Sequence, residues 1–208
     1  LNVSGSGSEG VRILGGDYGP WSQGPSHVKQ GAQNVLIEGA LFHDFTITDP
    51  EKHSECLMIW GGAGRVTIRN SVFQNCTDFG ILVKGSSGSI LIENSMFDVP
   101  MPGDTATASC NPGCPRGGNS LALSDGSGYV VRYSSFLGGL RVDPEVSNVV
   151  FKGNVGPRRS CPGDVSYSFN VWSNAKCSAS DRTAALSSVF VGPDSSAFDL
   201  HLQAGSAA

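Results

Sequence analysis

The stretch that decides the fold is Val66-Thr-Ile-Arg-Asn-Ser-Val-Phe73, because it occurs two more times in nearly the same form. The other two copies are Val35-Leu-Ile-Glu-Gly-Ala-Leu-Phe42 and Ile90-Leu-Ile-Glu-Asn-Ser-Met-Phe97. Weaker copies begin at Val11, Tyr129, Val149 and Val165. Recurrence at intervals of roughly 20 to 50 residues is typical of solenoids, in which equivalent positions of successive coils stack.

Each copy alternates as a β-strand does. Val66 and Ile68 point to one side of the strand, and Thr67 and Arg69 point to the other. Seven places after the start of most copies comes an aromatic residue: Tyr18, Phe42, Phe73, Phe97, Phe136 and Trp172. We therefore expect an internal stack with one ring in each coil.

A second strand is expected just before the next copy. Its inward pairs are Ser26/Val28, Leu57/Ile59, Ile81/Val83, Leu121/Leu123 and Leu140/Val142. These blocks are too short and too β-branched for helices. An antiparallel sandwich is the main competitor, but it would not need one residue type at one place in every repeat. The sequence thus predicts an all-β fold, a right-handed parallel β-helix of about seven coils, as one domain over residues 1–208.

Charged residues occupy the same outward place in successive copies: Glu38, Arg69, Glu93, Arg132 and Lys152. Opposite charges are neighbours along most of this row, which favours parallel stacking in register. A charged binding strip is one interpretation. We prefer the other, an exposed salt-bridge ladder that contributes little per pair.

The composition excludes several classes of protein. Hydrophobic residues make up 39% of the chain, too many for disorder, and only 15% are charged. No apolar run reaches the ~18 residues that a membrane span needs. The net charge is −4 and the basic residues are scattered, so we expect no nucleic-acid partner. We expect a monomer. Because the chain opens inside a repeat-like segment, Leu1 is predicted to be a processed or trimmed end.

Six cysteines in a loop-rich chain favour disulfides and an extracellular location. A structural zinc site is the alternative, but Cys110 and Cys114 are followed by no second ligand pair at a fitting distance. The predicted pairs are Cys56–Cys76, Cys110–Cys114 and Cys161–Cys177. The last pair would staple the C-terminal coils and end cap, residues 156–208.

The Val-x-Ile-x-Asn-Ser-x-Phe copies resemble the parallel β-helix repeat proteins, the pectate-lyase-like superfamily of polysaccharide lyases, hydrolases and epimerases. Residues 198–208 look like the closing segment of secreted members, and the segment from Tyr167 to Arg182 is similar to uncharacterised actinobacterial members. The resemblance implies a secreted, carbohydrate-facing protein. The superfamily's catalytic patterns do not transfer: Asn75-Cys-Thr-Asp78 is only a loose echo of the hydrolase set, and Asp49-Pro50 with His53 departs from the epimerase spacing.

Two long insertions, residues 46–55 and 98–119, are predicted to rise on one side and flank a groove. A polysaccharide lyase needs a base for the proton next to a uronate carboxylate, and a cation or acid to neutralise that carboxylate. The predicted catalytic residues are His53, Glu55 and Lys84. The predicted calcium ligands are Asp78 and Asp98, with Glu55 as a further candidate. A hydrolase would instead use two carboxylates, for instance Glu55 and Asp78 or Asp98.

The predicted sugar-binding residues are Trp60, Lys29, His43 and Asp44, with Trp60 as a stacking platform between Lys29 and Lys84. The alternative is that these loop-end polar residues only cap corners and bond to backbone. We expect a protein that binds an acidic polysaccharide and cleaves it as a lyase. A non-catalytic adhesion or tail-spike-like module is the second class, and an ice-binding solenoid is disfavoured because the outward rows are mixed in charge.

Overall fold

A computed structural model describes residues 2–6, 11–14, 32–46, 55–76, 78–85, 88–99, 118–157, 161–193, 199–206 and 208, with side chains from Ala32 onward except that of Thr46. Within these residues the chain is all-β, and its helical structure is one short 3₁₀ turn, η3 (Leu186–Ser188). Nearly all strands belong to three parallel sheets, called sheets A, B and C here. Each strand pairs with the strand that occupies the same place in the next repeat.

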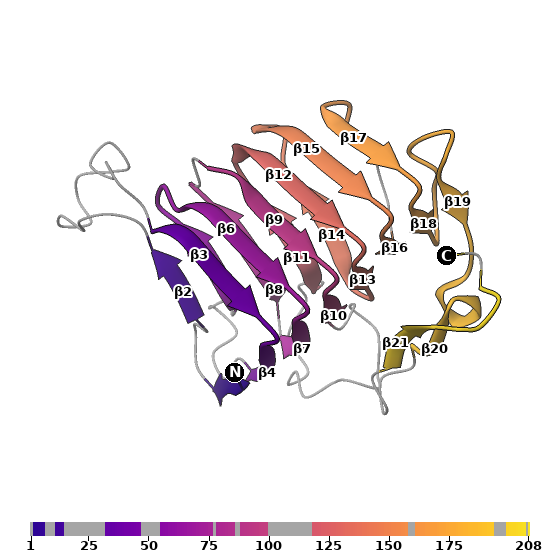
Figure 1. The fold of residues 1–208 in the computed structure, drawn as a ribbon, viewed down its shortest axis with the longest axis horizontal. Coiled ribbons are helices and arrows are strands. Elements are labelled where there is room, and N and C mark those ends of the chain that lie inside the picture. Colours follow the sequence, from indigo (N-terminus) through magenta and orange to yellow (C-terminus); the bar gives the residue numbers. More distant parts are fainter. Residues whose placement is uncertain are drawn as a thin grey trace.

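Sheet C contains the copies that decide the fold. Its six strands, in spatial order, are β3 (Gln33–Glu38), β6 (Gly64–Arg69), β9 (Ile90–Glu93), β12 (Gly126–Arg132), β15 (Val146–Lys152) and β17 (Val165–Ser168). In Figure 1 these strands lie side by side along the long axis of the molecule. Val66 is in register with Val35 on one side and Ile90 on the other. The predicted stacking of equivalent residues is therefore confirmed for these copies.

Sheet A follows sheet C in each repeat. Its strands are β1 (Asn2–Ser6), β4 (Leu41–Thr46), β7 (Val72–Cys76), β10 (Met96–Asp98), β13 (Ser135–Phe136), β16 (Val155–Gly156), β18 (Val171–Trp172) and β19 (Arg182–Thr183). Sheet B follows sheet A and precedes the sheet C strand of the next repeat. Its strands are β2 (Val11–Leu14), β5 (Glu55–Trp60), β8 (Phe79–Lys84), β11 (Asn119–Leu123) and β14 (Gly139–Val142). This strand order is that of a parallel β-solenoid.

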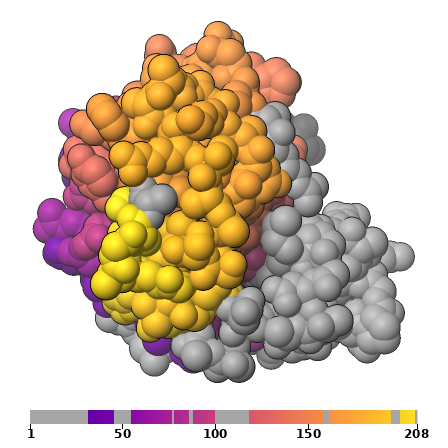
Figure 2. All heavy atoms as spheres, turned by 90° about the vertical axis from the view of Figure 1, so that its right-hand side faces the viewer, coloured from indigo at the N-terminus to yellow at the C-terminus, as the bar shows by residue number. Residues whose placement is uncertain are grey.

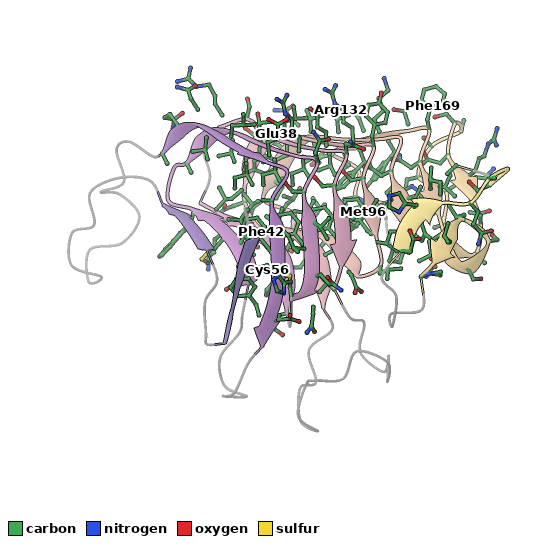
Figure 3. All side chains as sticks on the ribbon, turned by 60° about the horizontal axis from the view of Figure 1, so that its bottom comes forward. Glu38, Phe42, Cys56, Met96, Arg132 and Phe169 are labelled. Atoms are coloured by element: carbon green, nitrogen blue, oxygen red, sulfur yellow. A yellow bond between two sulfur atoms is a disulfide. The ribbon has the colours of Figure 1, made fainter. Side chains whose placement is uncertain are left out.

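The aromatic stack predicted from the sequence is present inside the solenoid. Phe42, Phe73 and Phe97 are almost fully buried, and their ring centroids follow one another at 4.8 Å with interplanar angles of 2°. Phe136 continues the stack at 4.8 Å. In the following repeat the equivalent position is Gly156, which carries no ring. A side chain would not fit there, because its Cβ would lie only 2.9 Å from the Cβ of Phe136. Figure 3 labels Phe42 within the coil.

The inward pairs of the second strand are also confirmed where the structure describes them. Leu57 is in register with Ile81, and Ile59 with Val83. Leu121 and Leu123 continue both rows toward Leu140 and Val142. Ser26 and Val28 lie outside the described residues.

One predicted copy is wrong. We expected Val11 to begin a strand equivalent to that of Val35, but β2 belongs to sheet B, where Val11 pairs with Leu57 and Ile13 with Ile59. The error has a physical cause: a period-two pattern of apolar residues fits the inner face of any of the three sheets. The position beside Trp60 that we assigned to Lys29 is consequently occupied by Leu14. Lys29 and Tyr18 lie outside the described residues.

Two rows mark the corner from sheet C to sheet A. The first row has positive φ angles, and its members are Gly39, Asn70, Asn94, Tyr133, Gly153 and Phe169. The second row is buried and polar, and its members are Ser71, Ser95, Ser134, Asn154 and Asn170. Each side-chain oxygen of this buried row accepts a hydrogen bond from the backbone N–H one repeat earlier, as between Ser95 Oγ and the Ser71 N–H at 3.2 Å. The row thereby satisfies backbone groups that a turning corner leaves unpaired.

The C-terminal end of the solenoid is covered by its own last segments. Strands β20 (Phe190–Gly192) and β21 (Asp199–Leu202) form an antiparallel pair. Phe190 and Leu200 pack with Val155 and Val171 of sheet A, and Met96 lies against this cluster. Figure 2 looks onto this end, where the orange and yellow segments lie toward the viewer.

Two of the predicted disulfides are present. Cys56 of β5 is bonded to Cys76 of β7, and Cys161 to Cys177. Cys110 and Cys114 lie outside the described residues. Two disulfides indicate an extracellular or otherwise oxidising environment. The described residues contain no helix that is long and apolar enough to cross a membrane.

Candidate functional site

The candidate groove residues fall at the two ends of the sheet B strands. The first end is the corner where sheet A meets sheet B, from which both insertions depart. The second end is the corner where sheet B meets sheet C. Most of both insertions, including His53, lies outside the described residues.

Three carboxylates are buried at the first corner. Glu55 begins β5, Asp78 directly precedes β8, and Asp98 ends β10. Their exposed fractions are 1%, 4% and 3%. A buried carboxylate is stable only with hydrogen-bond partners or with a cation beside it, and all three have interactions within the structure. Three of the four buried carboxylates of the described residues therefore lie at this corner.

The predicted calcium ligands do not come together with a third ligand in this part of the structure. Among the described residues, no group of three or more His, Cys, Asp or Glu side chains is placed to hold a metal ion. Asp98 is in register with Gln74 of sheet A, whereas Asp78 stands at the start of sheet B. The described residues alone therefore do not form a calcium site, and the role of Asp78 and Asp98 stays a prediction.

His43 and Asp44 form a hydrogen-bonded pair at the same corner. The Nδ1 atom of His43 lies 2.7 Å from Oδ2 of Asp44, and Nδ2 of Asn75 donates to Oδ1 of Asp44 at 2.7 Å. These hydrogen bonds, first from Asn75 and then from His43, lower the pKa of Asp44 below its ordinary value. An ionised Asp44 accepts from Nδ1–H, so Nε2 is the basic nitrogen of the neutral ring. The arrangement orients an imidazole near the end of β4.

The role of Asn75 in orienting Asp44 was not predicted from the sequence. Asp44 and Asn75 occupy the same place in successive repeats and both have positive φ angles, 59° and 51°. Asn and Asp adopt this conformation more readily than most residues. An Asp and an Asn at one position of the repeat were the signal that would have identified this contact.

Trp60 and Lys84 lie together at the second corner. They are in register in β5 and β8, so their Cα atoms are about 4.8 Å apart. A Cβ at Gly85 would lie 3.0 Å from Cδ1 of Trp60, which places the indole against this glycine. Trp60 is half-buried and Lys84 is exposed. The result is a supported aromatic face with an ammonium group beside it.

The two corners are too far apart to act on one bond. Glu55 and Lys84 were both predicted to be catalytic, yet Glu55 is in register with Phe79, five residues before Lys84 in the same strand. Five residues of parallel strand span about 16 Å. Lys84 and Trp60 therefore lie together at the second corner, separate from the polar residues at the first.

The chain was compared with known proteins in three ways. No family model, no curated protein and no solved structure matched it.

Proposed function

We propose that this chain binds an acidic polysaccharide in an extracellular setting. The observation that carries the proposal is the pairing of Trp60 and Lys84 on neighbouring strands. An indole face offers apolar contact to the C–H groups of a sugar ring, and an ammonium at one strand spacing reaches a ring carboxylate or sulfate. The contact with Gly85 supports this function. The indole packs against the glycine backbone, so part of its conformational freedom is already lost before the ligand binds.

The binding experiment uses a defined oligogalacturonate and a neutral oligosaccharide of similar length, titrated calorimetrically. Trp60→Ala should weaken binding of both ligands about tenfold, because stacking does not depend on charge. Lys84→Ala should weaken only the acidic ligand, and more strongly at low salt. Lys176→Ala is the matched control, since Lys176 is also exposed but lies near the C-terminal end. Unchanged affinity in both Trp60 and Lys84 variants would make the proposal wrong.

We further propose that the chain cleaves this polysaccharide by β-elimination at the first corner. A base removes the proton next to the uronate carboxylate, the electron pair forms a C=C bond, and the glycosidic oxygen leaves and takes up a proton. His43, oriented by Asp44, is the best-placed described base. His53 in the first insertion is the other candidate. A calcium ion held in part by Asp78 and Asp98, with further oxygen ligands from outside the described residues, would neutralise the substrate carboxylate.

Cleavage is tested by the ultraviolet absorbance of unsaturated products, measured with calcium and with a chelator. His43→Ala and His53→Ala, made singly, should separate the two candidate bases, and Asp44→Asn should lower the rate without loss of binding. A rate that survives both histidine variants would exclude an imidazole base.

A non-catalytic binding module is the second candidate function. The observation that favours it is that Glu55, Asp78 and Asp98 are buried, whereas Trp60 is half-buried and Lys84 is exposed. Tight binding of the acidic oligosaccharide without any product would support this function.

The finer description of the fold belongs to the same proposal. We infer a right-handed β-helix of about seven coils, similar to the pectate-lyase-like superfamily. Parallel strands joined by crossovers within one sheet are right-handed in nearly all proteins. An experimental structure of the chain would test the handedness and the number of coils directly.

A further inference from the structure

Tyr133 and Phe169 occupy backbone positions that disfavour them. Both lie in the corner row between sheets C and A, with φ angles of 53° and 56°. The other members of this row are glycines and asparagines, which tolerate positive φ. A bulky aromatic residue there is strained, and such strain persists only where neighbouring structure enforces it. Strained positions of this kind cluster at functional sites.

The neighbouring structure does enforce both positions. The N–H of Tyr133 donates to the carbonyl of Lys152 at 3.0 Å, and the next residue, Ser134, is buried in the polar row. The N–H of Phe169 donates to Oγ of Ser180 at 3.1 Å, and the next residue, Asn170, is fully buried. The backbone at both positions is therefore held by hydrogen bonds and by a buried neighbouring residue, and neither aromatic ring is needed to hold it.

Both rings are nevertheless presented to solvent. Tyr133 is 53% exposed and Phe169 is 67% exposed, among the most exposed large hydrophobic residues of the described chain. They are two repeats apart, about 10 Å, with Gly153 between them. A Cβ at Gly153 would lie 2.7 Å from Cδ1 of Tyr133, so the tyrosine ring leans over this glycine toward Phe169. The two rings form a short aromatic strip, defined here as Tyr133, Gly153 and Phe169.

The charge next to the strip is positive. Along the outward row Glu38 pairs with Arg69 at 2.7 Å and Glu93 with Arg132 at 2.6 Å, after which the alternation of sign ends. Lys152 comes next, is exposed, and pairs with no carboxylate in the described part of the chain. The Arg132 guanidinium lies 5.8 Å from the centre of the Tyr133 ring. Figure 3 shows Glu38, Arg132 and Phe169 along the same edge of the solenoid.

We propose that the aromatic strip and Lys152 form a second binding site for an acidic saccharide. Sugar rings stack on Tyr133 and Phe169, and a carboxylate or sulfate of the same saccharide binds Lys152. This site lies at the opposite end of the sheet C strands from Trp60 and Lys84, about 16 Å along a strand. The inference rests on the proposed function for its ligand class, but it uses none of the same residues.

The test replaces each aromatic residue by the residue that other repeats use. Tyr133→Asn and Phe169→Asn combined should relieve backbone strain, so the melting temperature should be unchanged or higher. The same double variant should weaken binding of an oligogalacturonate at this site by about tenfold or more. Lys152→Ala should weaken the oligogalacturonate but not a neutral oligosaccharide of equal length. Calorimetric titration gives the affinity and the number of sites.

The outcomes separate this inference from the proposed function. If the double variant and Lys152→Ala remove the same one of two titrated sites, and Trp60→Ala removes the other, then this inference and the proposed function both stand. If the corner variants reduce binding and Trp60→Ala and Lys84→Ala do not, this inference stands and the first site is wrong. If the corner variants bind as the wild type does while Trp60→Ala weakens binding, this inference is overturned. If the wild type binds no acidic saccharide, both are overturned.

Discussion

The indole Nε1 of Trp172 donates a hydrogen bond to Oδ2 of Asp181 across 3.1 Å, inside the last turn of the solenoid. Asp181 accepts four further hydrogen bonds, from the backbone N–H groups of Asn170, Cys177 and Ser178 and from the side chain of Asn170. Both Asp181 and Trp172 are almost fully buried. Asp181 is therefore the last member of the buried polar row, and it links Asn170 of that row to the backbone of Cys177 and Ser178.

Asp181→Ala should therefore be strongly destabilising. The substitution leaves several buried donors without an acceptor, each at a cost of about 1–3 kcal/mol, so we expect a loss of at least ~3 kcal/mol in the free energy of unfolding. Chemical denaturation measures this loss. Asp164→Ala is the control, because Asp164 is exposed and its replacement should change stability by less than about 0.5 kcal/mol. Equal effects of the two substitutions would contradict the role assigned to Asp181.

The same carboxylate should make stability depend on pH. Burial raises the pKa of Asp181, but the hydrogen bonds from Asn170, Ser178 and Trp172 together outweigh burial, and the pKa lies below its ordinary value. A depressed folded-state pKa adds stability above the unfolded-state pKa of about 4, and this stability is lost as the pH falls through the folded-state pKa. The stability difference between wild type and Asp181→Asn should accordingly shrink between pH 7 and pH 3. A difference that is constant with pH would show that folding does not lower the pKa of Asp181.

The two disulfides should differ in their access to reductant. Cys56 and Cys76 are fully buried, whereas Cys161 is exposed. Under native conditions a mild thiol should reduce Cys161–Cys177 first, because exchange needs the attacking thiolate to reach a sulfur. Alkylation and mass spectrometry of peptides identify the order. In unfolded protein the two bonds should be reduced at similar rates, which serves as the control.

The aromatic stack should contribute strongly to stability. Phe73 is fully buried between Phe42 and Phe97, both at 4.8 Å. Phe73→Ala leaves a cavity in the middle of the stack and should cost about 3–5 kcal/mol, while Phe73→Leu should cost less because it fills part of the volume. Leu36→Ala, at an exposed position, is the control. Thermal unfolding of the three variants would give the ranking.

The sequence predicted the parts of this fold that repetition specifies. Phe42, Phe73 and Phe97 recur at one position of a long motif, and only parallel stacking satisfies all three at once. The strand of Val11 was assigned to the wrong sheet because alternation alone does not distinguish the inner faces of three sheets. The repeat could also have shown the polar row, since Ser71, Ser95 and Ser134 are followed at the same position by Asn154 and Asn170.

The candidate site was less predictable, for a geometric reason. Glu55 and Lys84 are in neighbouring repeats, which suggested that they lie close together. Their separation depends instead on position along the strand, and five residues place them at opposite corners. The contact between Asp44 and Asn75 arises because both stand at one position of the strand, one repeat apart. In a solenoid, position within the repeat therefore determines which side chains meet.

The contact of Asn75 with Asp44 gives a prediction that does not depend on catalysis. Asn75→Gly keeps a residue that tolerates the φ of 51° but removes the hydrogen bond to Oδ1 of Asp44. Because this hydrogen bond favours the ionised carboxylate, its loss should raise the pKa of Asp44 toward the ordinary value. Carbon-13 NMR titration of the Asp44 carboxyl group measures the change. Asn94→Gly, which removes a hydrogen bond to Asn70 in the other corner row, should leave the Asp44 titration unchanged. If Asn75→Gly also leaves the Asp44 titration unchanged, the hydrogen bond from Asn75 does not stabilise the ionised carboxylate. The proposed orientation of the His43 base by Asp44 would then lack the support of Asn75.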